Sequence, residues 1–160
     1  MPEHSEPAPV AHRTAEVALR GPAPRRRARV HWPAPGGHAP TLVILFADPP
    51  PREPGDTLVR QLVEDCGAVV LEAVAAHAVE AHAVVAWAAD HAAELGADPS
   101  RLILVGEGAG AAPAERVAEL ALDEGWPPLR HVALLWPHGD RAATLHELFS
   151  ALRTAARWSP

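Results

Sequence analysis

Short apolar runs of the length of a buried strand alternate along this chain with stretches whose apolar residues recur every three or four positions. The runs predict strands, and the periodic stretches predict helices. The expected strands cover 27–32, 41–46, 68–74, 102–105 and 131–136, and the expected helices cover 56–66, 79–95, 111–123 and 142–156. Repeated strand–helix–strand order with apolar strands is typical of a parallel sheet covered by helices on both faces. The sequence therefore predicts an α/β fold: a three-layer sandwich with a mostly parallel sheet.

Turn-forming residues indicate where some of these elements begin and end. Asp56 is expected to cap the first helix and Gly67 to end it. The glycines and proline of the segment 35–37 predict a tight turn. We therefore expect the strands at 27–32 and 41–46 to pair as a hairpin.

Length and composition are typical of one domain. The 160 residues are 48% hydrophobic, which is enough for a buried core. The proline-rich start predicts a flexible N-terminal segment over 1–24, followed by the domain over 25–160. A formal net charge of -6 disfavours nucleic acid and anionic membranes as partners. The basic run Arg25–Arg29 is expected to be a solvated strand edge or tail segment rather than a binding patch.

Cysteine content and hydropathy bear on the compartment. The single cysteine, Cys66, excludes an intramolecular disulfide, and its apolar helical position predicts packing in the core. The first residues have neither the basic start nor the apolar run of a secretion signal. No apolar stretch is long enough to span a bilayer. The sequence therefore predicts a cytoplasmic protein.

The most informative motif lies between the expected strand 102–105 and the expected helix 111–123, and reads Gly106-Glu107-Gly108-Ala109-Gly110. It matches the G-x-S-x-G turn of α/β-hydrolases in all but one position. In that turn a strained strand-to-helix corner presents a serine nucleophile to the substrate. Here Gly108 takes the position of the serine and has no side chain.

The segments around this turn resemble the hormone-sensitive-lipase branch of esterases, which carries G-D-S-A-G at the same point. Residues 92–102 resemble the lead into that turn. Residues 41–46 and 67–70 are similar to the early strands of the family, and 127–137 to the strand after the nucleophile helix. The resemblance covers most of residues 25–137 and implies an α/β-hydrolase fold with esterase-type chemistry.

Two further features depart from what the resemblance implies. The family's oxyanion loop reads H-G-G-G, whereas this chain has Ala47, Asp48, Pro49 and Pro50 after the strand. Proline has no N–H to donate, and one lost oxyanion donor typically costs about 3 kcal/mol of transition-state stabilisation. The chain also ends at Pro160, before the strands that carry the family's acid and histidine. We therefore expect the second half of the enzyme to be absent.

These departures predict a non-catalytic, pseudoenzyme-like hydrolase homologue without assigned catalytic residues. Its expected role is interaction or ligand binding, as a homo-oligomer or with a protein partner. The strand at 131–136 would form an exposed sheet edge, which favours pairing with another chain. The last helix would contribute a groove formed by Leu145, Leu148, Phe149 and Leu152.

Three alternatives stay open. In an atypical carboxylic-ester hydrolase, Glu107 would activate water directly, or another chain would supply the missing half. The spacing Gly106-x-Gly108-x-x-Ala111 also fits a dinucleotide-binding turn. Against that alternative, Glu107 would repel a pyrophosphate, and the nearest acid after the next strand, Asp140, is displaced past a turn. A decayed homologue without selected activity is the third alternative.

The remaining candidate histidines and Asp140 are interpreted as structural residues, not as catalytic or metal-binding ones. His138, Asp140 and His146 follow the last strand, where a polar turn is expected, and no serine is present for them to activate. His77, His82 and His91 lie five and nine positions apart, which does not match the spacing of ligands on one helix face. The sequence therefore predicts neither a metal site nor a cofactor.

Overall fold

The computed structural model describes residues 12–19, 26–36, 38–47 and 57–157, and the statements below concern those residues. Six strands form one sheet in the order β1-β2-β4-β3-β5-β6. They are β1 (His12–Leu19), β2 (Arg26–Pro33), β3 (Leu42–Phe46), β4 (Val69–Ala73), β5 (Leu102–Glu107) and β6 (Leu129–Leu135). Strands β4, β3, β5 and β6 are parallel, whereas β2 runs antiparallel to both β1 and β4.

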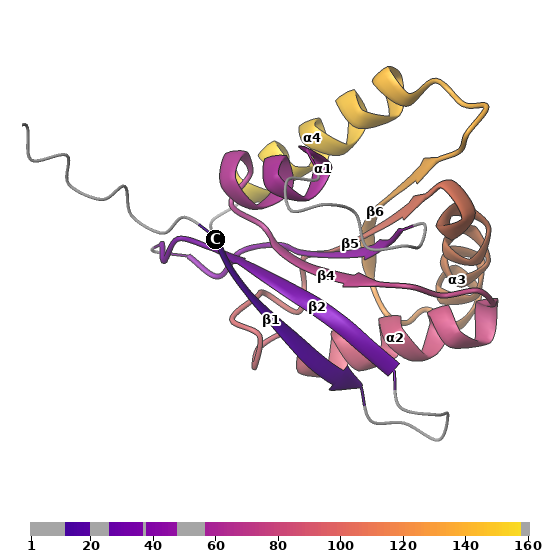
Figure 1. Ribbon diagram of the computed structural model, residues 1–160, viewed down its shortest axis with the longest axis horizontal. Coiled ribbons are helices and arrows are strands. Elements are labelled where there is room, and N and C mark those ends of the chain that lie inside the picture. The colour runs from indigo at the N-terminus through magenta and orange to yellow at the C-terminus, as the bar shows by residue number, and fades with distance from the viewer. Residues whose placement is uncertain (1–11, 20–25, 37, 48–56, 158–160) are drawn as a thin grey trace, which may run out of the picture.

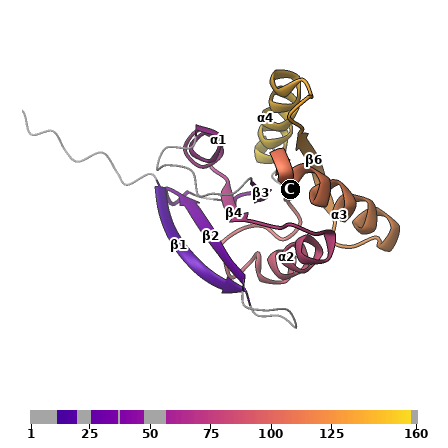
Figure 2. The same cartoon turned by 45° about the vertical axis from the view of Figure 1, so that its right-hand side comes forward.

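Helices cover both faces of this sheet (Figure 1). They are α1 (Thr57–Arg60), which continues as a π-helical turn η1 (Gln61–Asp65), then α2 (Ala78–His91), α3 (Ala111–Glu124) and α4 (Arg141–Arg157). Figure 2 shows α1 and α4 above the sheet and α2 and α3 below it. Each face has its own apolar cluster, one with α1, η1 and α4 and the other with α2 and α3. The predicted three-layer sandwich is therefore confirmed.

The central strands are buried because they have a neighbour on each side and helices on each face. Every residue of β3 and β5 is buried. This environment explains their continuous apolar sequence, since no side of such a strand meets water. Among the described helices, none combines the length and the apolar character that a membrane crossing requires.

Two expectations for the N-terminal part are wrong. Strands β2 and β3 do not form a hairpin: β2 pairs with β1 and β4, and β3 lies between β4 and β5. The segment 1–24 was expected to be flexible throughout, yet it contributes β1. This strand is at the edge of the sheet and mostly exposed, so its sequence lacks a continuous apolar run. The domain boundary after residue 24 stays a prediction.

Two arginines of β2 form ion pairs across to the neighbouring strand. Arg27 Nη1 lies 4.0 Å, and Arg29 Nη2 3.7 Å, from carboxylate oxygens of Glu16 in β1. Because β1 pairs along its whole length with β2, Arg27 and Arg29 lie on an inner strand and not at the edge of the sheet, whereas Arg25 is outside the described residues. The two ion pairs are exposed and contribute little to stability.

The groove expected on the last helix is absent from the described structure. Leu148 and Leu152 are buried against the chain's own sheet, and Leu145 and Phe149 pack partly buried beside them. They belong to the apolar cluster on this face of the sheet, where α4 packs mainly against β6, so their buried surface is not available to a partner. The expected edge position of 131–136 is confirmed, since β6 is the last strand of the sheet.

Candidate active site

The turn at Gly106–Gly110 adopts the geometry that its motif predicts. Strand β5 ends at Glu107, and a short 3₁₀ turn over Gly108–Gly110 leads into α3 at Ala111. Gly108 has a φ of +59°, which lies in the left-handed region that side chains adopt at a cost. The chain therefore forms the sharp strand-to-helix corner on which α/β-hydrolases place their nucleophile.

The two outer glycines allow this corner to form. A Cβ on Gly106 would lie 2.6 Å from the Cβ of Ala114 in α3. A Cβ on Gly110 would lie 2.7 Å from the carbonyl carbon of Phe46 at the end of β3. Glycine at these positions lets α3 begin directly against β3 and β5, which holds the corner between the two central strands.

The corner lies where ligands commonly bind in this kind of sheet. Strands β3 and β5 are neighbours in the centre of the sheet. The chain continues from β3 outward to β4 on one side of this pair, and from β5 outward to β6 on the other side. Open α/β sheets bind ligands outside the carboxyl ends of their strands, at the point where the order reverses. Glu107 and Gly108 occupy that point, between the ends of β3 and β6.

Glu107 is the buried carboxylate of the corner, with only 5% of its surface exposed. It pairs in register with Leu135, and its side chain lies on the α4 face of the sheet. There its Oε1 lies 3.9 Å from Nη1 of Arg141, the first residue of α4. About half of the Arg141 side chain is exposed, so solvent screens the pair.

Arg141 is the charged residue beside the corner that sequence reasoning did not single out. A signal was present, because the carboxyl ends of β5 and β6 meet at one edge of a parallel sheet. The residues just after β6 are therefore neighbours of the corner. The structure brings a carboxylate and a guanidinium together there, which provides one group that accepts a proton and one that attracts negative charge.

The oxyanion segment is described only at its first residue. The N–H of Ala47 donates to the carbonyl oxygen of Ala73 at 3.3 Å, so this donor is used inside the sheet. Asp48, Pro49 and Pro50 lie outside the described residues. Within the described part of the chain, Arg141 supplies a cation beside the corner.

The polar residues after β6 form the turn that their sequence predicts. The N–H of Gly139 donates to the carbonyl of Trp136 at 3.1 Å, and Asp140 Oδ1 accepts from the N–H of Ala143 at 3.0 Å. Asp140 thus caps the first turn of α4, the role that aspartate commonly has before a helix. His138 and His146 are exposed.

The three histidines near α2 lie apart from one another. His91 stacks on Trp87 with a ring-centroid distance of 4.3 Å and is bonded through Nδ1 to the Trp87 carbonyl, and His82 Nε2 lies 3.7 Å from Glu124 Oε2. His77 precedes the first residue of α2. In the described ranges, no three His, Cys, Asp or Glu side chains form a group that could hold a metal ion.

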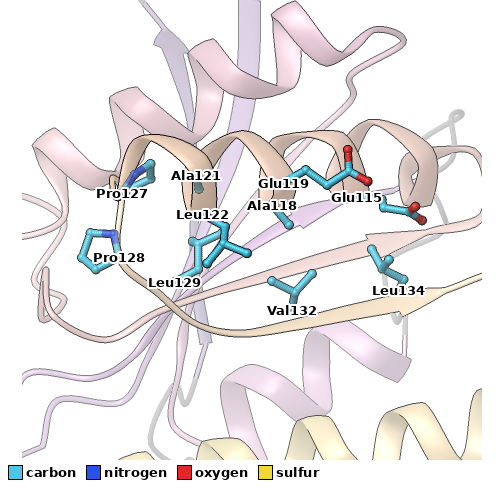
Figure 3. Close-up of a pocket in the computed structure, with 11 residues that line it drawn as sticks. Glu115, Ala118, Glu119, Ala121, Leu122, Pro127, Pro128, Leu129, Val132 and Leu134 are labelled. Carbon is cyan, nitrogen blue, oxygen red and sulfur yellow. The ribbon is translucent and has the colours of Figure 1, made fainter.

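An apolar groove of about 500 Å³ lies on the other face of β6, beside α3 (Figure 3). Val132 and Leu134 form its floor, Leu122 lies on the α3 side, and Glu115 and Glu119 carry the charged groups. Leu134 is the register partner of Gly106, whereas Glu107 pairs with the next residue, so the groove and the Glu107 carboxylate are on opposite faces. Pairing with another chain at this edge stays a prediction.

Solved structures of esterases are similar to this chain. An esterase of the hyperthermophilic archaeon Pyrobaculum calidifontis matches with a TM-score of 0.67 and 24% identity, over 76% of this chain and 44% of the esterase chain. A thermostable esterase from Pseudomonas putida ECU1011 matches with a TM-score of 0.65 and 25% identity, over 78% and 43%. The chain thus spans less than half the length of these structures.

A curated relative is similar in sequence over a shorter stretch. Carboxylesterase NlhH of Mycobacterium tuberculosis is 45% identical over 51 residues, which are 32% of this chain and 16% of the relative. These findings overturn the expectation of a non-catalytic protein and favour its ester-hydrolase alternative. That expectation rested on Gly108, on the prolines of the oxyanion segment and on the expected absence of the strands that carry the family's acid and histidine.

The family itself is shown by a match to most of the chain. A family model described as alpha/beta hydrolase fold matches residues 46–158. The match includes the corner, α3, β6 and the whole of α4, which are the elements that position Glu107 and Arg141. This chain therefore belongs to the alpha/beta hydrolase fold family.

Proposed function

We propose that this chain acts as a carboxylic-ester hydrolase whose chemistry is centred on Glu107. The observation that carries the proposal is a buried carboxylate at the strand-to-helix corner, with the Arg141 guanidinium 3.9 Å away. Similarity to proteins called esterase and carboxylesterase supports the reaction class. The chain spans less than half the length of those structures, so the esterase activity of the whole protein is itself part of what we propose.

The proposed reaction needs water as its nucleophile, since Gly108 has no side chain. Glu107 accepts a proton from a water molecule while the water oxygen bonds to the ester carbonyl carbon. The resulting oxygen anion is attracted by the Arg141 guanidinium. The bond to the alcohol oxygen then breaks, and the proton on Glu107 passes to the leaving alcohol. The products are one carboxylic acid and one alcohol, and Glu107 regains its starting state.

The test is hydrolysis of a short-chain p-nitrophenyl ester by the purified chain, compared with a Glu107→Gln variant. Glutamine keeps the size of the side chain but removes the proton acceptor, so we expect kcat to fall about 100-fold or more. Glu147→Gln is the matched control, because Glu147 is exposed on α4 and the change in charge is the same. We expect this control to retain the wild-type rate.

A second variant tests the role of the guanidinium. Arg141→Gln should lower kcat more than it raises KM, because the attraction is to charge that forms in the transition state. Turnover by the wild type at the rate of the buffer alone would overturn the proposal. Equal kcat values for the wild type and Glu107→Gln would overturn the role of Glu107.

A further inference from the structure

Hydrogen bonds connect three side chains across neighbouring strands in the half of the sheet opposite to β5 and β6. Thr14 Oγ1 lies 3.3 Å from His31 Nδ1, and His31 Nε2 lies 3.0 Å from Glu72 Oε2. These residues belong to β1, β2 and β4. Thr14 pairs directly with His31, and His31 pairs with Val70, two positions before Glu72. Directly paired residues share a face, as do residues two apart, so the register itself holds the three together.

For a neutral His31, the two hydrogen-bond partners determine which ring nitrogen carries the proton. An ionised carboxylate only accepts hydrogen bonds. Nε2 of a neutral His31 is therefore protonated and donates a hydrogen bond to Glu72. Nδ1 then carries the lone pair that accepts a hydrogen bond from the hydroxyl of Thr14. The hydroxyl proton therefore points at a base whose ring is oriented by a carboxylate. Nucleophile, base and orienting acid follow one another in this order in hydroxyl-based acyl transfer.

Exposure differs along the three residues in the way such chemistry requires. His31 is 6% exposed, so water has little access to the base, whereas Thr14 is exposed on the edge strand. The His31 ring is bonded at both nitrogens and lies on a paired strand, which limits its reorientation. A substrate can thus reach the hydroxyl while the base stays in place.

We infer that Thr14 is a nucleophile that accepts acyl groups from small activated carboxylic esters, at a site separate from Glu107. In this step the Thr14 oxygen bonds to the ester carbonyl carbon while His31 Nδ1 takes the hydroxyl proton. The bond from that carbon to the leaving oxygen breaks, and the proton passes from His31 to the leaving alcohol. The product is an acyl ester of Thr14, and water can later hydrolyse it to the free acid.

A cation on the same face of the sheet can attract the oxygen anion that forms during the attack. Arg29 is two residues from His31 in β2 and is the register partner of Glu72. Its guanidinium lies 3.7 Å from the Glu16 carboxylate and its side chain is 41% exposed. Arg29 therefore stays accessible to solvent and, together with Arg27, adds positive charge to the face that carries the Glu16 and Glu72 carboxylates.

The test measures covalent labelling of the full chain with p-nitrophenyl acetate by intact mass, with peptide mapping to locate the acetyl group. We expect one acetyl group per chain on Thr14 and none there in Thr14→Val, which replaces an exposed residue by one of similar size and β propensity. Thr154→Val is the matched control, because the Thr154 hydroxyl donates to the carbonyl of Ser150 and has no histidine partner among the described side chains. It should be labelled like the wild type.

The roles of His31 and Glu72 are tested separately from that of the Thr14 hydroxyl. His31→Gln should slow acetylation of Thr14 roughly 100-fold or more, and Glu72→Gln should slow it less. Circular dichroism establishes that each variant is folded. If His31→Gln does not fold, Glu72→Gln carries the test, because Glu72 is partly exposed. Acetylation of other residues but not Thr14, or equal rates at Thr14 in the wild type and the folded His31 and Glu72 variants, would overturn the inference.

Discussion

Gly110 lies directly against the main chain of Phe46, so that a Cβ at Gly110 would be 2.7 Å from the Phe46 carbonyl carbon. The backbone of β3 is paired on both sides and cannot move away locally. Gly110→Ala should therefore lower the free energy of unfolding by about 2–3 kcal/mol. Urea denaturation measures the change. Gly36→Ala is the control, since a Cβ at Gly36 has no atom within 4 Å. Equal midpoints for the two variants would contradict this account of the corner.

Gly108→Ser tests the backbone of the corner. The left-handed φ of +59° should cost a serine about 1–2 kcal/mol in the free energy of unfolding. Gly36→Ser provides the comparison, because the φ of Gly36 is not positive. Differential scanning calorimetry of both variants measures the difference in stability, and a serine tolerated equally at both positions would contradict the assigned geometry.

Asp98 and Ser100 predict a pH-dependent contribution to stability. The hydroxyl and the N–H of Ser100 donate to Asp98 Oδ1 at 2.7 and 2.9 Å, and these bonds hold the pKa of Asp98 below its ordinary value. A lowered folded-state pKa stabilises the fold above the ordinary pKa, and this stability is lost as the pH falls through the folded-state value.

Ser100→Ala should therefore lower the free energy of unfolding near neutral pH by about 0.5–1 kcal/mol, with a smaller effect once Asp98 is protonated. Thermal melts as a function of pH measure this change. The control is Ser100→Ala in an Asp98→Asn background, where the pH dependence of the effect should disappear. The same loss at every pH in both backgrounds would show that the carboxylate is not involved.

Cys66 should react slowly with alkylating reagents. Burial raises the pKa of its thiol, the Asp65 carboxylate raises it further, and Arg153 opposes them. Because the thiolate is the reactive form, the pH midpoint of iodoacetamide alkylation should lie above that of a free cysteine. Asp65→Asn should move this midpoint down and Arg153→Gln should move it up. Shifts of the opposite sign would contradict the assigned electrostatics.

The parallel half of the fold could be predicted from the sequence because its signals are local. Apolar runs mark β3 and β5, and glycines with positive φ mark the ends of η1 and α3 at Gly67 and Gly125. The pairing of β2 could not be predicted in the same way. Its partner β4 lies beyond β3 and α1 in the sequence, and its partner β1 has no apolar run to mark it. The nearby Pro35–Gly36 turn favoured a local hairpin with β3 instead.

The candidate site was predictable only as far as its motif extends. The segment Gly106–Gly110 predicts a strand-to-helix corner, and Glu107 is the titratable residue in it. Its partner Arg141 lies beyond a complete helix and strand, and only the parallel order of β5 and β6 brings it near. The contact between Thr14 and His31 likewise depends on a register that no local pattern specifies.

The position of β3 also constrains how the chain folds. Both of its neighbours come later in the sequence. The pairing of Leu42 with Leu102 closes a long loop that contains α1, β4 and α2. The centre of the sheet thus depends on closing long loops, which lowers folding rates relative to chains with local contacts. Strands β1 and β2 can meet early as neighbours, but they are fixed to the domain only after β4 arrives. The most buried strand is therefore among the last to be completed.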